Sequence, residues 1–137
     1  MPLVVVDTCV VSYLYSGVPL SDRYRERIGE HDKAISFMTL AELHYGTLKR
    51  DWSSERRDAL LAHVTRDYEL LPFDVRLCLQ WAEVRGHTGR LGRLMGVADS
   101  WIAATALLYN APLATHNRKH FEVLEPRLNL MSEAPES

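Results

Sequence analysis

The chain has 137 residues, of which 47% are hydrophobic and 25% charged, and its formal net charge is −2. A chain of this length and composition is expected to fold as one globular domain with a core of its own. The net charge excludes a general electrostatic attraction to nucleic acid, so binding of a polyanion requires a local basic patch or a metal ion.

The sequence predicts a cytoplasmic protein with no attachment to a membrane. No apolar run reaches the roughly 20 residues that span a bilayer, and the N-terminus lacks the basic segment and cleavage site of a secretory signal. The two cysteines, Cys9 and Cys78, do not form a CxxC pair and are expected to be reduced, mostly buried thiols.

The first strand is the clearest element, because residues 3–6 are four consecutive apolar residues, as in a strand buried on both faces. Asp7 follows this strand directly. A carboxylate in such a place loses its hydration unless a cation or hydrogen bonds meet it. Ligands also gather at the ends of strands in α/β sheets, so Asp7 is the first candidate functional residue.

The rest of the chain alternates between helical and strand patterns. Helices are predicted over residues 8–14, 22–30, 40–49, 55–68, from 75 onward, and 97–109. Strands are predicted over residues 34–37, 69–73, 112–115 and 128–131. This alternation predicts a single α/β domain over residues 1–131, in which helices flank both faces of a mainly parallel central sheet of four to five strands. The polar residues 132–137 are expected to form a disordered tail.

The sequence also predicts three helix N-caps and one glycine-rich loop. Thr8, Thr39 and Asp74 are predicted N-caps, and Glu42 stands three residues after Thr39, in the capping-box position. Residues 86–96 hold four of the seven glycines and are predicted to form a loop.

Three of the 18 acidic residues, Asp7, Glu42 and Asp99, lie in apolar segments rather than among other charges. Glu42 alone is explained equally well by a capping box. For Asp99 alone, stabilisation of a helix N-terminus is the less favoured alternative. Together, three carboxylates at one end of a sheet would raise each other's pKa, and a divalent cation would relieve this conflict. Oxygen ligands suit Mg²⁺ or Mn²⁺, ions that serve phosphoryl transfer.

A fourth candidate follows the strand predicted at residues 112–115. Asn117 places an amide oxygen at the same sheet edge, and Arg118 and Lys119 beside it suit phosphate groups. An ordinary polar turn explains this segment equally well.

Four segments in this order carry a resemblance to a known family. They are Val4–Thr8 (VVVDT), Thr39–Gly46 (TLAELHYG), Ala98–Ala106 (ADSWIAATA) and Thr115–Phe121 (THNRKHF). They resemble the four blocks of the PIN domain, and specifically the VapC-type toxins of toxin–antitoxin pairs. The resemblance implies a PIN-like fold and a metal-dependent endoribonuclease.

The resemblance also implies roles for residues. Asp7, Glu42 and Asp99 would be ligands of Mg²⁺ or Mn²⁺, and a metal-bound water would attack the RNA phosphodiester. The last acidic position of the family would fall on Asn117, or on His120 as in relatives with an acid later in this segment. Asn117 would complete the catalytic set, but the missing acid leaves the number of ions open. Thr8 and Thr115 would orient the ligands.

Histidines and arginines near these segments are further candidates for the site. His116 and His120 are candidate general bases or, alternatively, surface histidines. Arginines that would form a basic rim for RNA are Arg85, Arg90, Arg93 and Arg118. The same arginines are equally explained as parts of a solvated loop.

The resemblance implies two protein partners, a second copy of the chain in a homodimer and a cognate VapB-like antitoxin. Tyr45, Leu48 and Trp52 are candidate antitoxin contacts, or else core residues. The alternative to a nuclease is a catalytically weak or inactive PIN-like binding module, because the fourth acid is missing. A receiver domain or a haloacid-dehalogenase-like phosphatase would need a second acid near Asp7, where Cys9 stands instead.

Overall fold

The fold is organised around a five-stranded sheet in which every strand pairing is parallel. The computed structural model describes residues 2–133. The strands are β1 (Leu3–Val6), β2 (Asp32–Ile35), β3 (Glu69–Leu70), β4 (Leu113–Ala114) and β5 (Leu130–Met131), in the spatial order β3-β2-β1-β4-β5. The predicted fold class, a mainly parallel sheet of four to five strands, is confirmed.

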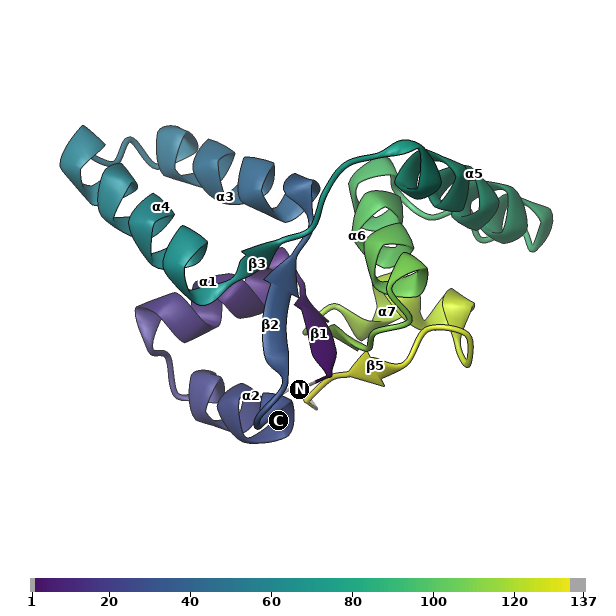
Figure 1. Ribbon diagram of the computed structural model, residues 1–137, viewed down its shortest axis with the longest axis horizontal. Coiled ribbons are helices and arrows are strands. Elements are labelled where there is room, and N and C mark those ends of the chain that lie inside the picture. Colours follow the sequence, from purple (N-terminus) through teal and green to yellow (C-terminus); the bar gives the residue numbers. More distant parts are fainter. Residues whose placement is uncertain (1, 134–137) are drawn as a thin grey trace.

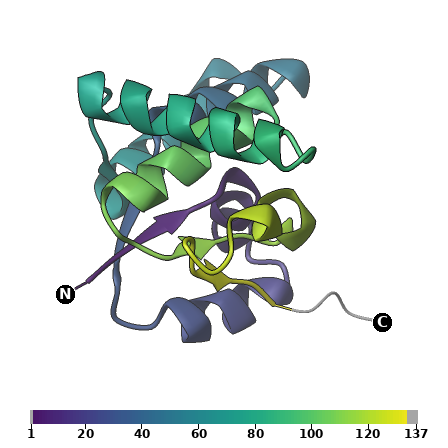
Figure 2. The same ribbon diagram turned by 90° about the vertical axis from the view of Figure 1, so that its right-hand side faces the viewer.

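Helices cover both faces of this sheet (Figures 1 and 2). They are α1 (Thr8–Ser16), α2 (Leu20–Ile28), α3 (Phe37–Lys49), α4 (Ser54–Asp67), α5 (Val75–Arg90), α6 (Val97–Leu108) and α7 (Arg118–Phe121), followed by a short 3₁₀ turn, Glu122–Leu124. Figure 1 shows α1 to α4 on one side of the strands and α5 to α7 on the other.

The alternation of side chains along β1 explains why two layers of helices are needed. Val5 packs into one buried cluster with residues of α5 and α6, including Val84 and Ile102. Val4 and Val6 point to the other face and pack into a second cluster with residues of α1, α2 and α4. Because Val4, Val5 and Val6 are fully buried, the apolar run is read correctly as a central strand.

The strand order places a topological switch point at β1. From β1 the chain adds β2 and then β3 on one side, whereas β4 and β5 lie on the other side. The carboxyl ends of β1 and β4 therefore open onto a crevice, which is where open α/β sheets bind ligands. Asp7 follows β1 and Thr115 follows β4, so both stand at this crevice.

The predicted loop over residues 86–96 is wrong in its first part, because α5 continues through Gly86 and Gly89 to Arg90. The buried Thr88 explains the difference. Its hydroxyl donates to Val84 O at 2.9 Å and accepts the Met95 N–H at 3.2 Å. These contacts outweigh the roughly 1 kcal/mol that a glycine costs a helix interior.

Two of the three predicted caps are also wrong. Asp7, rather than Thr8, caps α1, and Ser36, rather than Thr39, caps α3 by accepting the Thr39 N–H at 3.1 Å. Helix α3 therefore begins at Phe37, and Glu42 lies beyond its first turn instead of in a capping box. Asp74 caps α5 as predicted, accepting the Leu77 N–H at 3.1 Å.

The end of the described chain is tied to α2, and both cysteines are free. Of the expected tail, residues 134–137 lie outside the described residues, whereas Glu133 forms ion pairs with Arg23 and Arg27 of α2. Cys9 and Cys78 are free thiols, each only partly buried. Within residues 2–133, no helix is long and apolar enough to cross a membrane.

Candidate active site at the sheet switch point

Asp7 is the most buried carboxylate of the site and is held by three donors. Its side chain is 4% exposed. Its Oδ1 accepts the Thr8 N–H at 2.8 Å, and its Oδ2 accepts the Thr115 hydroxyl at 2.7 Å and the Cys9 thiol at 3.5 Å. As the N-cap of α1, the carboxylate also lies at the positive end of that helix. These contacts fix one of its oxygens against β4 and the other against α1.

Glu42 reaches the site from α3 and meets the hydroxyl of Thr8. The Thr8 Oγ1 donates to Glu42 Oε1 at 2.8 Å and lies 3.1 Å from Thr39 Oγ1. Because Thr8 also gives its backbone N–H to Asp7, this residue connects the two carboxylates. The predicted supporting role of Thr8 thus has a definite set of contacts to act through.

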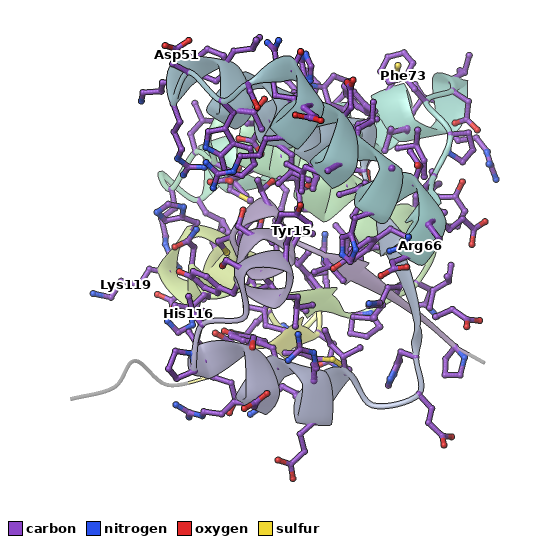
Figure 3. All side chains as sticks on the ribbon, turned by 90° about the vertical axis from the view of Figure 1, so that its left-hand side faces the viewer. Tyr15, Asp51, Arg66, Phe73, His116 and Lys119 are labelled. Atoms are coloured by element: carbon purple, nitrogen blue, oxygen red, sulfur yellow. The ribbon has the colours of Figure 1, made fainter. Side chains whose placement is uncertain are left out.

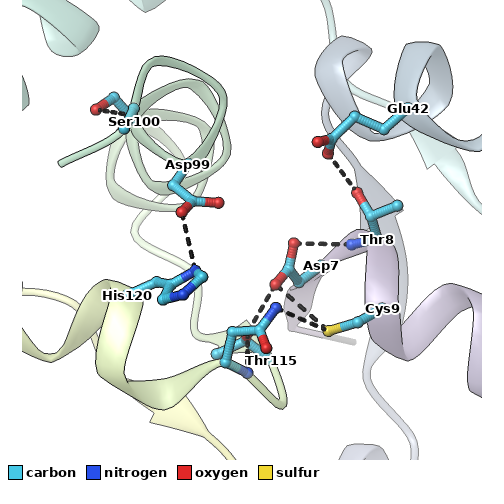
Figure 4. A network of polar contacts seen from close by, with 10 residues as sticks. Asp7, Thr8, Cys9, Glu42, Asp99, Ser100, Thr115 and His120 are labelled. Carbon is cyan, nitrogen blue, oxygen red and sulfur yellow. Dashed lines mark hydrogen bonds and ion pairs between the residues drawn. The ribbon is translucent and has the colours of Figure 1, made fainter. Parts of the chain in front are cut away.

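Asp99 approaches from the opposite side, on the first turn of α6. Its Oδ2 lies 3.2 Å from Nδ1 of His120. Figure 4 shows the carboxyl groups of Asp7, Glu42 and Asp99 turned toward one another across the crevice. The structure therefore brings together the three acids that stand out in the sequence.

Asn117 joins the site at its exposed edge. Its backbone N–H donates to Thr115 Oγ1 at 3.0 Å, and its amide Nδ2 lies 3.8 Å from Cys9 Sγ. The Cys9 sulfur thus contacts both the Asn117 amide and the Asp7 carboxylate. Sequence reasoning missed Cys9 as a contact of Asp7, since nothing at its position in the sequence shows what it will face. His120, a candidate from the sequence, lies against Asp99.

The carboxylates influence one another electrostatically. Burial raises the pKa of Asp7, and the charge of Asp99 raises it further, while the donors Thr115 and Thr8 lower it. Burial likewise raises the pKa of Asp99, with His120 lowering it and Glu42 raising it. Burial and the charge of Asp7 raise the pKa of the Cys9 thiol to about 12, so Cys9 stays protonated. The site therefore holds excess negative charge that a cation would relieve.

The donor set fits a hard divalent ion in its chemistry, since it offers carboxylate oxygens and one amide oxygen. Among residues 2–133, however, no three Asp, Glu, His or Cys side chains are close enough to hold one ion as they stand. Instead, Glu42 accepts a hydrogen bond from the Thr8 hydroxyl, and Asp99 pairs with His120. An ion would therefore compete with these two contacts.

The four arginines of the predicted basic rim differ in their surroundings. Arg85 donates to Met95 O and lies over the Trp81 ring, so it belongs to the packing of α5. Arg118 pairs with both oxygens of Glu125, at 2.6 and 2.8 Å. Arg90 is exposed at the end of α5.

Arg93 is the arginine of this group that lies beside the acids. It shares a hollow of about 360 Å³ with Asp99, Lys119 and His120, and its guanidinium is 3.9 Å from Glu122. Lys119 is exposed and projects from the edge of the molecule (Figure 3). A basic rim therefore exists next to Asp99, but Arg93 and Lys119 form it.

A groove leads away from the acids on the side of α1, α3 and α4. It has a volume of about 490 Å³ and is lined by Thr8 and Glu42 at one end and by Trp52 and Arg56 further along. The Arg56 guanidinium lies 3.7 Å from the centre of the Trp52 ring. Tyr45 and Leu48 are exposed on α3 outside this groove, so neither is a core residue.

Known proteins share this sequence pattern and fold. The pattern described as the PIN domain matches residues 4–125. The chain is 29% identical over 119 residues to "Ribonuclease VapC1" of Haemophilus influenzae strain R2866, covering 85% of this chain and 88% of the relative. It is 28% identical over 117 residues to the "tRNA(fMet)-specific endonuclease VapC" of Shigella flexneri, with coverage of 85% and 88%.

Among solved structures, the chain is similar to one of VapBC2 from Rickettsia felis bound to a DNA fragment from its promoter. The TM-score is 0.81 at 26% identity, with 96% of this chain and 99% of the other covered.

Proposed function

This chain belongs to the PIN-domain family, and we propose that it is the ribonuclease toxin of a VapBC-type toxin–antitoxin pair. The family match confirms the resemblance predicted from the four sequence segments. The observation that carries the proposal is the convergence of Asp7, Glu42 and Asp99 at the switch point of the sheet. Relatives named as VapC ribonucleases and a structural neighbour named as a VapBC complex support it.

Metal dependence is part of this proposal. Asp7, Glu42 and Asp99 would hold Mg²⁺ or Mn²⁺, with the Asn117 amide oxygen at the open edge. A bound ion supplies a water molecule of lowered pKa and neutralises charge that develops on the scissile phosphate. Thr115 and the Thr8 N–H hold the Asp7 carboxylate in one orientation, and the Thr8 hydroxyl does the same for Glu42. These two threonines therefore act by orienting ligands.

RNA would approach along the basic edge beside Asp99. Arg93 and Lys119 flank the hollow that contains Asp99, and Arg90 and Arg118 lie exposed nearby in the sequence. Arg118 would have to leave Glu125 to contact a phosphate, and Arg85 would have to leave its position over Trp81. Affinity for RNA should fall as the salt concentration rises, because phosphate contacts release counterions.

The antitoxin would occupy the groove that runs from Glu42 to Trp52. Glu42 lines this groove, so a segment lying in it would block access of RNA to Glu42. Trp52 is thus the candidate contact that lines the groove, whereas Tyr45 and Leu48 would contact the antitoxin only outside it. The toxin would act in the cytoplasm as a homodimer.

Cleavage of total tRNA by the purified protein tests this function. Asp7→Asn and Asp99→Asn should each reduce Mn²⁺-dependent cleavage more than about 100-fold, because even indirect partners of a metal contribute 10–100-fold. Asp22→Asn is the matched control, since Asp22 is an exposed acid of α2. Both site variants should keep the circular dichroism spectrum of the wild type.

The alternative, an inactive PIN-like binding module, makes the opposite prediction. All three acids are retained at the switch point, and this does not favour loss of catalysis. Wild-type protein that leaves RNA intact with Mg²⁺ and Mn²⁺, or site variants that cut as fast as the wild type, would refute the proposed function.

A further inference from the structure

The loop between β4 and α7 carries two groups of the site, the Thr115 hydroxyl and the Asn117 amide. Its backbone is fixed at the start by the Thr115 N–H, which donates to Met131 O at 3.1 Å. The Thr115 hydroxyl then serves both Asp7 and the Asn117 N–H. A shift of this loop would therefore move a donor of Asp7 and the Asn117 amide together.

Tyr24 of α2 contacts this loop through its hydroxyl group. Its side chain is fully buried, and its hydroxyl oxygen lies 3.2 Å from Thr115 O and 2.7 Å from His116 Nδ1. The same oxygen accepts the Glu133 N–H at 3.1 Å. A phenol can do this because its hydroxyl both donates and accepts, and burial raises the pKa of Tyr24 and so keeps the proton in place.

His116 is fixed between two aromatic rings as well as by this hydrogen bond. Its ring packs edge-to-face against Tyr24 and Tyr13, with centroid distances of 5.7 Å in both cases. Figure 3 shows His116 at the edge of the molecule that also carries Lys119. The structure thus accounts for His116 as a residue that holds the loop.

Glu133 brings the end of the described chain into the same cluster. Its carboxylate pairs with Arg23 at 3.1 Å and with Arg27, both on α2, and its backbone N–H reaches Tyr24. One buried hydroxyl therefore joins three segments that are far apart in the sequence, namely α2, the β4–α7 loop and the segment after β5.

We propose that Tyr24 is a positioning residue of the acidic site, whose hydroxyl holds Thr115 and Asn117 in register with Asp7. This inference rests on the proposed function for its catalytic readout, but the contacts themselves do not. It assigns α2 and the segment ending at Glu133 a part in the site through the Tyr24 hydroxyl.

Tyr24→Phe tests the proposal, and Tyr68→Phe is its matched control. Both tyrosines are buried in the same apolar cluster, but the Tyr68 hydroxyl has no hydrogen-bond partner among residues 2–133. Both substitutions remove one buried oxygen atom, so they differ in the contact with the loop. Tyr24→Phe should lower kcat about 10- to 100-fold with KM for RNA changed less than about twofold, because small misplacements at a site have effects of this size. Tyr68→Phe should leave both constants unchanged.

Two measurements without RNA separate this inference from the proposed function. Amide hydrogen exchange of Asn117, whose N–H donates to Thr115, should become faster in Tyr24→Phe and stay unchanged in Tyr68→Phe. Calorimetric affinity for Mn²⁺ alone should fall in Tyr24→Phe only. If the wild type does not cut RNA, the proposed function fails while these two measurements still decide the role of Tyr24.

The inference would be overturned by wild-type kcat and wild-type exchange at Asn117 in Tyr24→Phe. It would also be overturned if Tyr68→Phe caused the same losses, because the effect would then come from packing in the cluster and not from the hydrogen bonds to the loop.

Discussion

Asp7 keeps its carboxylate in a place where burial opposes ionisation, and this has a consequence for stability. Burial and the charge of Asp99 raise the pKa of Asp7 in the folded protein, despite the hydrogen bonds from Thr115 and Thr8. The folded state then binds more protons than the unfolded state, so stability from this group is present below the unfolded pKa of about 3.9. It is lost as the pH rises through the raised folded pKa.

The prediction at this residue concerns Asp7→Asn in metal-free buffer. The variant cannot ionise at position 7, so its free energy of unfolding relative to the wild type should increase as the pH rises above about 4. Urea denaturation of both proteins in EDTA between pH 4 and pH 8 measures this difference. A difference that stays constant or shrinks with rising pH would contradict the raised pKa of Asp7.

Asn117 is the residue that we propose to stand where the family has its last acid. An acid there would add a negative oxygen ligand beside the Cys9 thiol, at the open edge of the crevice. Asn117→Asp should therefore tighten Mn²⁺ binding, by up to about 100-fold in Kd. Isothermal titration calorimetry checks this, with Asn110→Asp at the end of α6 as the control. Equal affinity in the wild type and Asn117→Asp would place residue 117 outside the ligand set.

At the scale of the element, α5 shows how a tertiary contact extends a helix across glycines. Thr88 is fully buried, and its hydroxyl accepts the N–H of Met95 from the link that follows. This bond folds the link back over the last turn of α5. The hydroxyl thus holds the last turn of α5 against the segment that leads into α6, the helix that carries Asp99.

Thr88→Val tests this contact, because valine keeps the shape of the side chain and removes the acceptor. The buried Met95 N–H would lose its partner, and the variant should lose about 1–3 kcal/mol of unfolding free energy. Thr65→Val in α4 is the control, since Thr65 also donates to the carbonyl four residues before it but is exposed. Chemical denaturation should show a change within about 0.5 kcal/mol for the control.

At the scale of the whole molecule, exposed apolar side chains gather where α5 begins. Phe73, Val75 and Leu79 are all more than half exposed, and the Phe73 ring contacts Trp101, which stacks on Trp81 at 4.9 Å. Exposed apolar groups in this number mark interaction surfaces. We expect this surface to form the interface of the proposed homodimer.

Sedimentation velocity can test the dimer. Leu79→Glu places a charge on this surface and should shift the protein toward the monomer, with at least a tenfold weaker Kd, since burying an unpaired charge costs more than 1.4 kcal/mol. Leu48→Glu on α3 is the matched control, because Leu48 is also exposed but lies on the other layer of helices. A wild type that sediments as a monomer at every concentration would contradict the homodimer.

The parallel α/β fold class and the choice of Asp7, Glu42 and Asp99 as candidate site residues follow from the sequence alone. Four apolar residues followed directly by Asp7 indicate a buried strand with a charged group at its end. Asp99 likewise places a charge in a helix that is otherwise apolar. Such patterns depend on neighbours within a few positions, which is the range over which helices and strands impose their periods.

The contacts of each acid, in contrast, depend on the tertiary structure. Thr8 meets Glu42 from 34 positions away, Thr115 meets Asp7 from 108, and Tyr24 meets His116 from 92. The same holds for α5, where a buried hydroxyl overrides the local preference of two glycines for a loop. Hydrogen bonds and burial of this kind depend on which segments the sheet order brings together, and no local rule in the sequence contains that order.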